Sequence, residues 1–151
     1  MVKIVTTNKR AYHRFRVLET LEAGIELKGP EIKSIRMGRV SLGSSYVKII
    51  GEEAYVLGMR IDPYPKAPRD AFDPQRKRKL LLRRSQIARL VGIDARKGFT
   101  IVPLKMYLKS GLAKLELGIC KGKTRRDRRE ELKEQAMQRD AERAMKDELK
   151  K

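Results

Sequence analysis

Residues 100–119 alternate between apolar and polar side chains on both sides of the connector Lys109-Ser110-Gly111. This alternation is typical of β-strands with one buried face, and the short glycine-containing connector predicts a hairpin. The buried face is predicted to hold Val102, Leu104, Met106, Leu108, Ala113, Leu115, Leu117 and Ile119. The outward face is predicted to hold Lys105, Tyr107, Lys114 and Glu116. A chain with this pattern must build its core on a β-sheet.

Four further strands are predicted upstream of this hairpin. Gly51-Glu52 indicates the turn of a second hairpin, in which Val47 and Ile49 are expected to be buried. Glu22-Ala23-Gly24 resembles another turn between two strands. The expected strand ranges are 13–20, 24–28, 44–50 and 53–60.

Two helices are predicted between the strands. Pro30 suits a first helical position and Gly38 a helix end, whereas Ser85 is the expected N-cap of a second helix that Gly92 stops. The stretch 62–79 is proline-rich and predicts a long surface connection. Six short strands with two helices favour a mainly-β fold, a six-stranded closed barrel of the OB type.

The composition of the chain changes at residue 120. Residues 1–120 carry 25 basic and 11 acidic side chains, a net +14, and contain every aromatic residue and every proline. Residues 121–151 carry 12 basic and 8 acidic side chains, a net +4. We therefore expect a domain at 1–120 and a basic tail at 121–151, and the total of +18 indicates an anionic polymer as partner.

The residue composition also disfavours several classes of protein. His13 is the only histidine and Cys120 the only cysteine, so a zinc cluster, a disulfide or a Cys–His nucleophile lacks its residues. We expect no metal, no cofactor and no enzymatic activity. The chain has no apolar run approaching the roughly 18 residues of a membrane span and no signal peptide. A cytoplasmic protein without a membrane partner is expected.

Two basic clusters could bind RNA. Arg76-Lys77-Arg78-Lys79 precedes three leucines, including Leu81, and Arg83-Arg84 follows them; at least partial burial of the leucines would fix the basic groups on a ridge. Lys9-Arg10 lies beside Tyr12, His13 and Phe15, a mixture of cations and rings that suits phosphates and unstacked bases. The alternatives are a solvated charge run for the first cluster and a plain core role for Phe15.

The tail is predicted to have two parts. Residues 121–129 are almost purely charged and are expected to be disordered in the free protein. An alanine-rich apolar stripe follows at helical spacing and predicts a helix that is marginal until a partner surface completes it. The stripe consists of Leu132, Ala136, Met137, Ala141, Ala144, Met145 and Leu149. A flexible tail without a specific role is the alternative.

Seven motifs, in order and in register, resemble those of the SsrA-binding protein (SmpB) family, the bacterial partners of transfer-messenger RNA (tmRNA). They run through most of residues 8–129. The motifs are Asn8-Lys9-Arg10-Ala11 with His13; Glu22-Ala23-Gly24; Glu31-Ile32-Lys33-Ser34 with Arg36 and Gly38; Asp73-Pro74; Arg78–Leu82; Pro103-Leu104 with Tyr107; and Gly122-Lys123 with Asp127-Arg128-Arg129.

The resemblance implies an OB-type barrel and a non-enzymatic adaptor. The family binds the tRNA-like domain of tmRNA and delivers it to stalled ribosomes for trans-translation, and its tail enters the vacant mRNA channel and decoding centre of the small subunit. Matched positions imply tmRNA contacts at Asn8, His13, Glu22, Leu81 and Lys114. Lys9, Arg10, Arg76, Arg78 and Lys79 join them as basic candidates. Tail residues expected to act on the ribosome are Gly122, Lys123, Arg126, Asp127, Arg128 and Arg129.

Two positions depart from the family pattern. Arg126 stands where the family often has His or Tyr, and Arg128 where lysine is common. A guanidinium plane can still stack on a base. We expect a monomer. A structural ribosomal protein or general RNA binder is the alternative function, and a hydrolase that uses His13 with Glu22 is a third.

Overall fold

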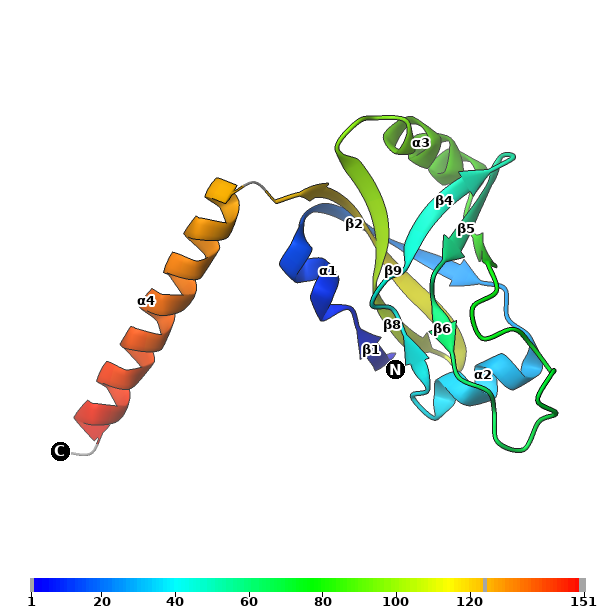
Figure 1. The fold of residues 1–151 in the computed structure, drawn as a ribbon, viewed down its shortest axis with the longest axis horizontal. Helices are drawn as coiled ribbons and strands as arrows, with labels where there is room; N and C mark the ends of the chain where they lie inside the picture. The colour runs from blue at the N-terminus through cyan, green and yellow to red at the C-terminus, as the bar shows by residue number, and fades with distance from the viewer. Residues whose placement is uncertain (1, 124, 150–151) are drawn as a thin grey trace.

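The computed structural model describes residues 2–123 and 125–149, and the side chains of 2–123 and 129–147. Most strands gather in one curled sheet, and the last helix stands apart from it (Figure 1). In chain order the elements are β1 (Val2–Thr7), α1 (Lys9–Arg14), β2 (Phe15–Ile25), α2 (Gly29–Arg36), β3 (Val40–Ser41), β4 (Tyr46–Ile50), β5 (Glu53–Leu57), β6 (Arg60–Ile61), β7 (Arg78–Leu81), α3 (Arg84–Asp94), β8 (Phe99–Lys109), β9 (Leu112–Gly122) and α4 (Arg125–Leu149).

Seven strands form one antiparallel sheet in the order β1-β8-β9-β2-β7-β5-β4, and β3 pairs with β6 separately. The mainly-β class with short helices is confirmed, with nine strands among the described residues instead of the six predicted. The closed barrel is wrong, because β1 and β4 are edges that no ladder joins in the described chain. β7 pairs with only two residues of each neighbour, and β4 lies near β8 without a ladder between them in the described chain.

The β8–β9 hairpin is confirmed. Lys109 pairs with Leu112, which leaves Ser110 and Gly111 as a two-residue turn with φ of 51° and 79°. Positive φ at both positions matches the turn twist that antiparallel strands favour. The second hairpin is also confirmed, because β4 and β5 pair around a turn at 51–52.

A register shift at Leu104 divides the apolar face of β8. A bulge of this kind reverses which side chains point to a given face. Met106 therefore packs in the main core, whereas Val102 and Leu104 pack with Ala11 of α1 in a second cluster. The prediction of one continuous buried face is wrong for this reason. Gly118 on β9 leaves space for the Leu104 side chain, since a β-carbon at Gly118 would lie 2.6 Å from Leu104 Cδ1.

β2 is one continuous strand, so the predicted turn at Glu22-Ala23-Gly24 is wrong. The segment remains extended because β9 pairs with it from Phe15 to Gly24 and β7 pairs with its end. The strand expected at 13–20 also begins later, since His13 belongs to α1. Ladders on both sides override the local turn preference of these residues.

The two predicted helices are present. α2 has proline in its first turn, and Gly38 beyond its end has φ of +75°. α3 differs in its ends: the Arg83 N–H donates to Gln86 Oε1 at 2.9 Å, and the helix continues through Gly92. Ser85 is therefore inside the first turn. Helix α1 was not predicted because it is only six residues long.

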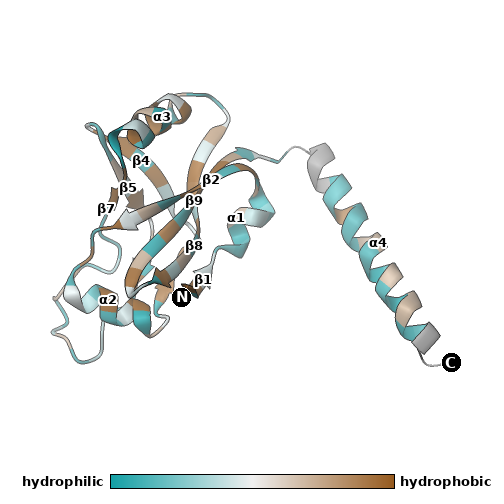
Figure 2. Cartoon of the chain, turned by 180° about the vertical axis from the view of Figure 1, so that it is seen from behind, coloured by the Kyte–Doolittle hydropathy of each residue, from teal (hydrophilic) through white to brown (hydrophobic). Residues whose placement is uncertain are grey.

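The main core packs buried apolar residues of the strands with Ile35 of α2 and Leu90 of α3. The strands are largely hydrophobic, whereas α4 is hydrophilic along most of its length (Figure 2). The long connection before β7 runs over 62–77 without helix or strand; it was predicted over 62–79, but Arg78 and Lys79 already belong to β7, and its Phe72 is buried.

α4 is a single helix of 25 residues. Within 121–129, where disorder was expected for the free protein, 121–122 end β9 and 125–129 begin α4. The stripe residues Leu132, Met137 and Met145 are exposed on it. Lys123 ties the start of the helix to the body: its Nζ donates to Tyr12 O at 2.9 Å and pairs with Glu131.

Candidate nucleic-acid interface

The outward residues of four neighbouring strands, β8, β9, β2 and β7, share one face of the sheet. The pairs Tyr107–Lys114, Glu22–Glu116 and Gly24–Leu81 are each directly opposite across strands, so their side chains point the same way. We call this the outer face. It follows directly from the alternation in the sequence, because the intervening residues are those of the core.

A groove of about 780 Å³ opens on the outer face beside the start of α3. Its lining includes four predicted site residues, Glu22, Lys79, Leu81 and Lys114. The full lining is Glu22, Gly24, Glu53, Lys79, Leu80, Leu81, Leu82, Arg83, Arg84, Gln86, Ile87 and Lys114. The fold therefore gathers two acids, several bases and an exposed leucine from β2, β5, β7, β9 and α3, and one of the acids, Glu53, lies 3.6 Å from Lys79 Nζ.

Gly24 lets Lys114 and Leu81 approach each other. A β-carbon at Gly24 would lie 3.2 Å from Leu81 Cβ and 3.6 Å from Lys114 Nζ. The Leu81 side chain is 53% exposed although its strand neighbour Leu80 is fully buried. The groove thus presents an ammonium group and an apolar surface next to each other.

Glu22 is held by contacts from β8. The Tyr107 hydroxyl donates to Glu22 Oε2, and Lys109 Nζ lies 3.6 Å from the same oxygen. The Tyr107 hydrogen bond is the largest influence on the pKa of Glu22 and, with Lys109 and Lys114, lowers it. Glu22 is therefore an ionised acceptor in a basic groove.

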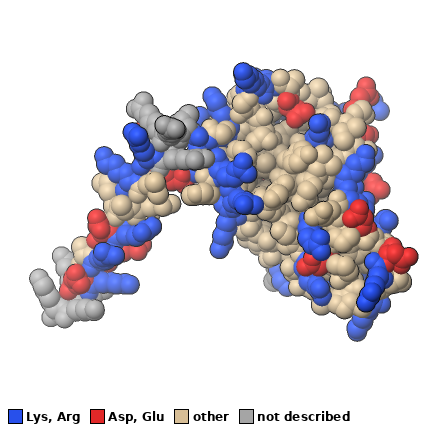
Figure 3. All heavy atoms as spheres, in the orientation of Figure 1, with Lys and Arg blue, Asp and Glu red and all other residues tan. Residues whose placement is uncertain are grey.

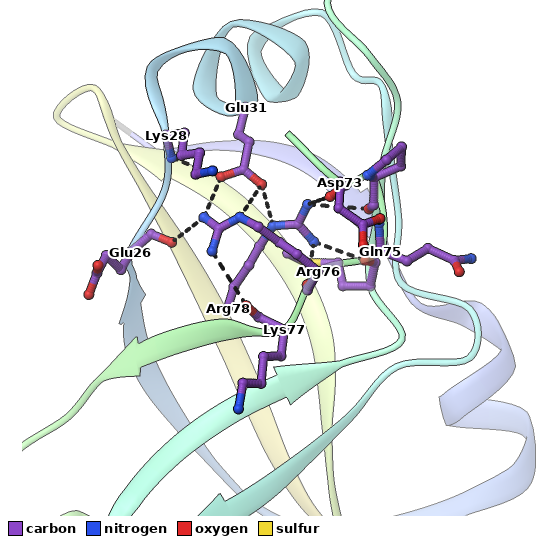
Figure 4. Close-up of polar contacts among 10 residues, drawn as sticks. Glu26, Lys28, Glu31, Asp73, Gln75, Arg76, Lys77 and Arg78 are labelled. Carbon is purple, nitrogen blue, oxygen red and sulfur yellow. Dashed lines mark hydrogen bonds and ion pairs between the residues drawn. The ribbon is translucent and has the colours of Figure 1, made fainter. Parts of the chain in front are cut away.

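Arg76 and Arg78 serve a buried cluster around Glu31 (Figure 4). Arg78 Nε donates to Glu31 Oε2 at 2.6 Å, Arg76 Nη2 to Oε1 at 2.5 Å, and the Lys28 N–H to Oε1 at 2.8 Å. The remaining Arg78 donors bind the carbonyl oxygens of Met59, Asp73, Pro74 and Arg76. The cluster ties α2 to β7 and to the connection before it.

The prediction that Arg78 contacts RNA is wrong, because its side chain is 0% exposed and its donors are occupied. Arg76 is partly exposed, and its Nη2 also reaches Glu26 O at 3.5 Å. Burial lowers the pKa of Arg78, which its pairing with Glu31 opposes. Desolvation alone would raise the pKa of Glu31, but Arg76, the Lys28 N–H and Arg78 together lower it.

Asn8 is likewise structural. Its Nδ2 donates to Leu42 O at 3.1 Å and to Pro103 O at 2.9 Å, and its Oδ1 caps α1 by accepting from the Ala11 N–H. The side chain is buried. Direct contact of Asn8 with RNA is therefore excluded by the geometry.

Lys9, Arg10 and His13 are exposed on α1, on a different surface from the groove. Glu22 lies seven residues along β2 from its start, roughly 23 Å. His13 and Glu22 therefore cannot act as an acid–base pair on one substrate, which removes the hydrolase alternative. Arg10 lines a second cleft of about 260 Å³ with Arg14, Ser44 and Tyr46.

Basic side chains gather where α4 leaves the body, and bases and acids mix along the helix (Figure 3). Gly122 ends β9, and Lys123 makes the contacts described above. Arg129 is exposed. The side chains of Arg126, Asp127 and Arg128 lie outside the described ones.

Sequence reasoning missed several groove residues. Tyr107 and Lys109, which contact Glu22 from beside the groove, were also missed, although they occupy outward positions of the β8–β9 hairpin. Gln86 and Ile87 enter the groove only because α3 begins beside β7, whereas Arg83 and Arg84 belong to the basic cluster predicted from the sequence. No local sequence pattern predicts that α3 begins beside β7.

Two further searches concern the described residues alone. Within them, no group of three or more His, Cys, Asp or Glu side chains is placed to hold a metal ion. In the same part of the chain, no helix combines the length and apolarity needed to cross a membrane.

The chain was compared with known proteins. It matches the family model described as SmpB protein over residues 5–147. It is 48% identical over 146 residues to an SsrA-binding protein of Desulfitobacterium hafniense, covering 97% of this chain and 94% of that protein. It is 47% identical over 149 residues to an SsrA-binding protein of Persephonella marina, covering 99% and 98%.

A solved structure is also similar. It is described as "tmRNA-SmpB: a journey to the center of the bacterial ribosome" and superposes with a TM-score of 0.68 at 42% identity, covering 85% of this chain and 93% of that one. The seven motifs, the fold and the near-complete matches agree: the chain belongs to the SmpB protein family.

Proposed function

We propose that this protein is an adaptor that binds the tRNA-like domain of tmRNA and brings it to stalled bacterial ribosomes for trans-translation. The observation that supports this proposal most is the near-full-length match to SsrA-binding proteins. A similar solved structure, whose description mentions tmRNA, SmpB and the ribosome together, supports it further. The basic groove supplies the chemistry, because folded RNA offers phosphates, sugar hydroxyls and exposed base edges.

The groove divides these tasks among its residues. Lys114 and Lys79 attract phosphate, Leu81 offers an apolar surface to an unstacked base, and Glu22 accepts a hydrogen bond from a base N–H or a 2′-hydroxyl. Arg83 and Arg84 extend the positive surface along α3. A carboxylate beside the cations favours bases and sugars over phosphate at that point.

The surface of α1 is a second proposed RNA contact. Lys9, Arg10 and His13 are exposed there, beside a cleft that also holds Arg14 and Tyr46. Cations next to an aromatic ring suit a phosphate with an adjacent base. The body would therefore touch RNA on two separate surfaces.

The tail, residues 121–151, is proposed to act on the ribosome separately from the body, residues 1–120. In this proposal α4 enters the vacant mRNA channel, and Gly122, Lys123, Arg126, Asp127, Arg128 and Arg129 work near the decoding centre. The exposed apolar stripe on α4 supports a helix that acquires a partner surface. Arg126 supplies a planar cation for stacking.

The protein is proposed to work as a monomer in the cytoplasm, with no catalytic step and no cofactor. The single histidine and the single cysteine support this, since they leave few groups for acid–base or nucleophilic catalysis. The RNA and the ribosome supply the chemistry of peptide tagging.

The test is recovery of RNA bound to the protein from cells, followed by sequencing. One dominant small RNA with a tRNA-like end is expected. A broad mixture of ribosomal RNA at constant stoichiometry would instead favour a structural ribosomal protein or a general RNA binder.

Point variants separate the body from the tail. Glu22→Ala or Lys114→Ala should lower affinity for the tRNA-like RNA about tenfold, whereas Asp127→Ala should leave affinity unchanged and abolish tagging. Lys66→Ala removes one exposed charge far along the long connection and serves as the matched control. Equal loss of RNA affinity in both sets would contradict the division.

A further inference from the structure

Tyr107 stands beside the groove rather than in it. It lies on β8, and β9 separates that strand from β2, yet its hydroxyl reaches Glu22 Oε2. The contact is possible because Tyr107 is opposite Lys114 and Glu22 opposite Glu116, which puts all four side chains on the outer face. Tyr107 therefore approaches Glu22 from the side away from Leu81.

The contacts leave one carboxylate oxygen for a ligand. Tyr107 and Lys109 both meet Glu22 at Oε2. Among the described residues, Oε1 has no such partner, and Glu22 itself lines the groove. An anchored Oε2 restricts rotation of the carboxylate, so the direction of Oε1 is fixed before RNA arrives.

The charges around Glu22 explain why it needs an anchor. Glu116 is directly opposite on β9 and repels it, while Lys114 and Lys109 attract it. Without a fixed donor the carboxylate could swing to either lysine. Burial first, and then the Glu22 contact, raises the pKa of Tyr107, so the hydroxyl remains a donor.

We propose that Tyr107 is a positioning residue that aims the Glu22 carboxylate into the groove, where Oε1 accepts a hydrogen bond from an N–H or O–H group of the bound RNA. This inference rests on the proposed function of the groove. The tyrosine then contributes to affinity without touching RNA, and it contributes only through Glu22.

The first experiment measures affinity for a transcribed tRNA-like domain of tmRNA. Tyr107→Phe should weaken binding about three- to tenfold, close to the effect of one oriented hydrogen bond. Tyr64→Phe removes a hydroxyl from the long connection and should bind as the wild type. Glu22→Ala should weaken binding about tenfold, and the double variant Tyr107→Phe/Glu22→Ala should be no weaker than Glu22→Ala alone.

A second measurement distinguishes positioning from loss of structure. In the free, folded protein, carbon-13 NMR titration should show a higher pKa for Glu22 in Tyr107→Phe than in the wild type. The slope of RNA affinity against salt should not change, because no phosphate contact is lost. A merely unfolded or loosened variant would not shift one carboxyl alone.

The outcomes distinguish failure of the groove as the RNA site from failure of Tyr107 as a positioning residue. If Glu22→Ala binds like the wild type, the groove assignment and this inference both fail. If Glu22→Ala is weak while Tyr107→Phe binds normally, only the inference fails. If the double variant is weaker than Glu22→Ala, Tyr107 acts by another route and the inference is overturned.

Discussion

Glu31 and Glu22 are both surrounded by cationic and hydrogen-bonding partners, but one is wholly buried and the other lies on the outer face. Glu31 binds two arginines and a backbone N–H, and its partner Arg78 fills its remaining donors with carbonyl oxygens. Glu22 has contacts on Oε2 only, as far as the described residues show. A satisfied carboxylate holds the fold together, and a half-satisfied one is available to a ligand.

The difference also explains the arginines. Arg78 and Lys79 are neighbours in the same basic run, yet the strand directs the first into the Glu31 cluster and the second to the groove. Since side chains alternate along a strand, a charged run divides its members between two faces. Charge density in the sequence is therefore a poor guide to which cations meet RNA.

The largest expected effect is a loss of stability when the buried carboxylate, Glu31, is removed. Glu31→Ala leaves Arg78 without its counter-ion and should lower the free energy of unfolding by about 3–5 kcal/mol. Glu22→Ala, the surface counterpart, should change it by less than about 0.5 kcal/mol. Urea unfolding of both variants makes the measurement, and equal losses would erase the distinction between the two carboxylates.

The contribution of Glu31 to stability should also depend on pH. Its pKa in the folded protein is below the ordinary value of 4.5, so its contribution to stability is present above that value and is lost as the pH falls through the lower, folded-state pKa. Stability measured by urea from pH 7 downward should fall less steeply in Glu31→Gln than in the wild type. Parallel curves would mean that other carboxylates govern acid unfolding.

In the groove, Gly24→Ala should lower the affinity for RNA. The new β-carbon would crowd Leu81 at 3.2 Å and displace Leu81 or Lys114 from their approach. We expect about tenfold weaker binding to the tRNA-like RNA, about 1.4 kcal/mol, with a folded protein. Gly29→Ala, where no atom lies within 4 Å of the added carbon, is the control and should bind normally.

The smallest effect is expected for an exposed ion pair. Arg89 Nη1 donates to Glu19 Oε1 at 2.6 Å, and both side chains are about half exposed. Arg89→Ala should leave the urea midpoint within experimental error, because solvent screens such pairs. A loss comparable to that of Glu31→Ala would show that exposure does not decide the strength of these contacts.

The elements that sequence predicted well are those with a local cause. The β8–β9 and β4–β5 hairpins combine alternation with turns that the backbone can adopt at Ser110-Gly111 and Gly51-Glu52. β2 was predicted as two strands because Glu22-Ala23-Gly24 has the residues of a turn. Only its partners β9 and β7 keep it extended, and partners are not visible in one segment.

The site could be predicted only in part. The family resemblance placed Glu22, Leu81 and Lys114 among the candidates, and the fold brings these three into one groove. Arg78 was wrongly included because its burial depends on Glu31, which lies 47 residues away in the chain. Tyr107 was given no role because its partner Glu22 is 85 residues distant.

The bulge at Leu104 constrains how many residues β8 can have between its two apolar clusters. It serves two apolar clusters from one strand, so the number of residues between them sets which side chains face each cluster. Deleting Leu108 while the turn at 110–111 keeps its place would put Met106 opposite Lys114 on the outer face and Tyr107 opposite Ala113 in the core, so Glu22 would lose its Tyr107 contact. Relatives that vary in length should therefore keep this count and place insertions in 62–72, ahead of the point where Asp73 anchors the chain.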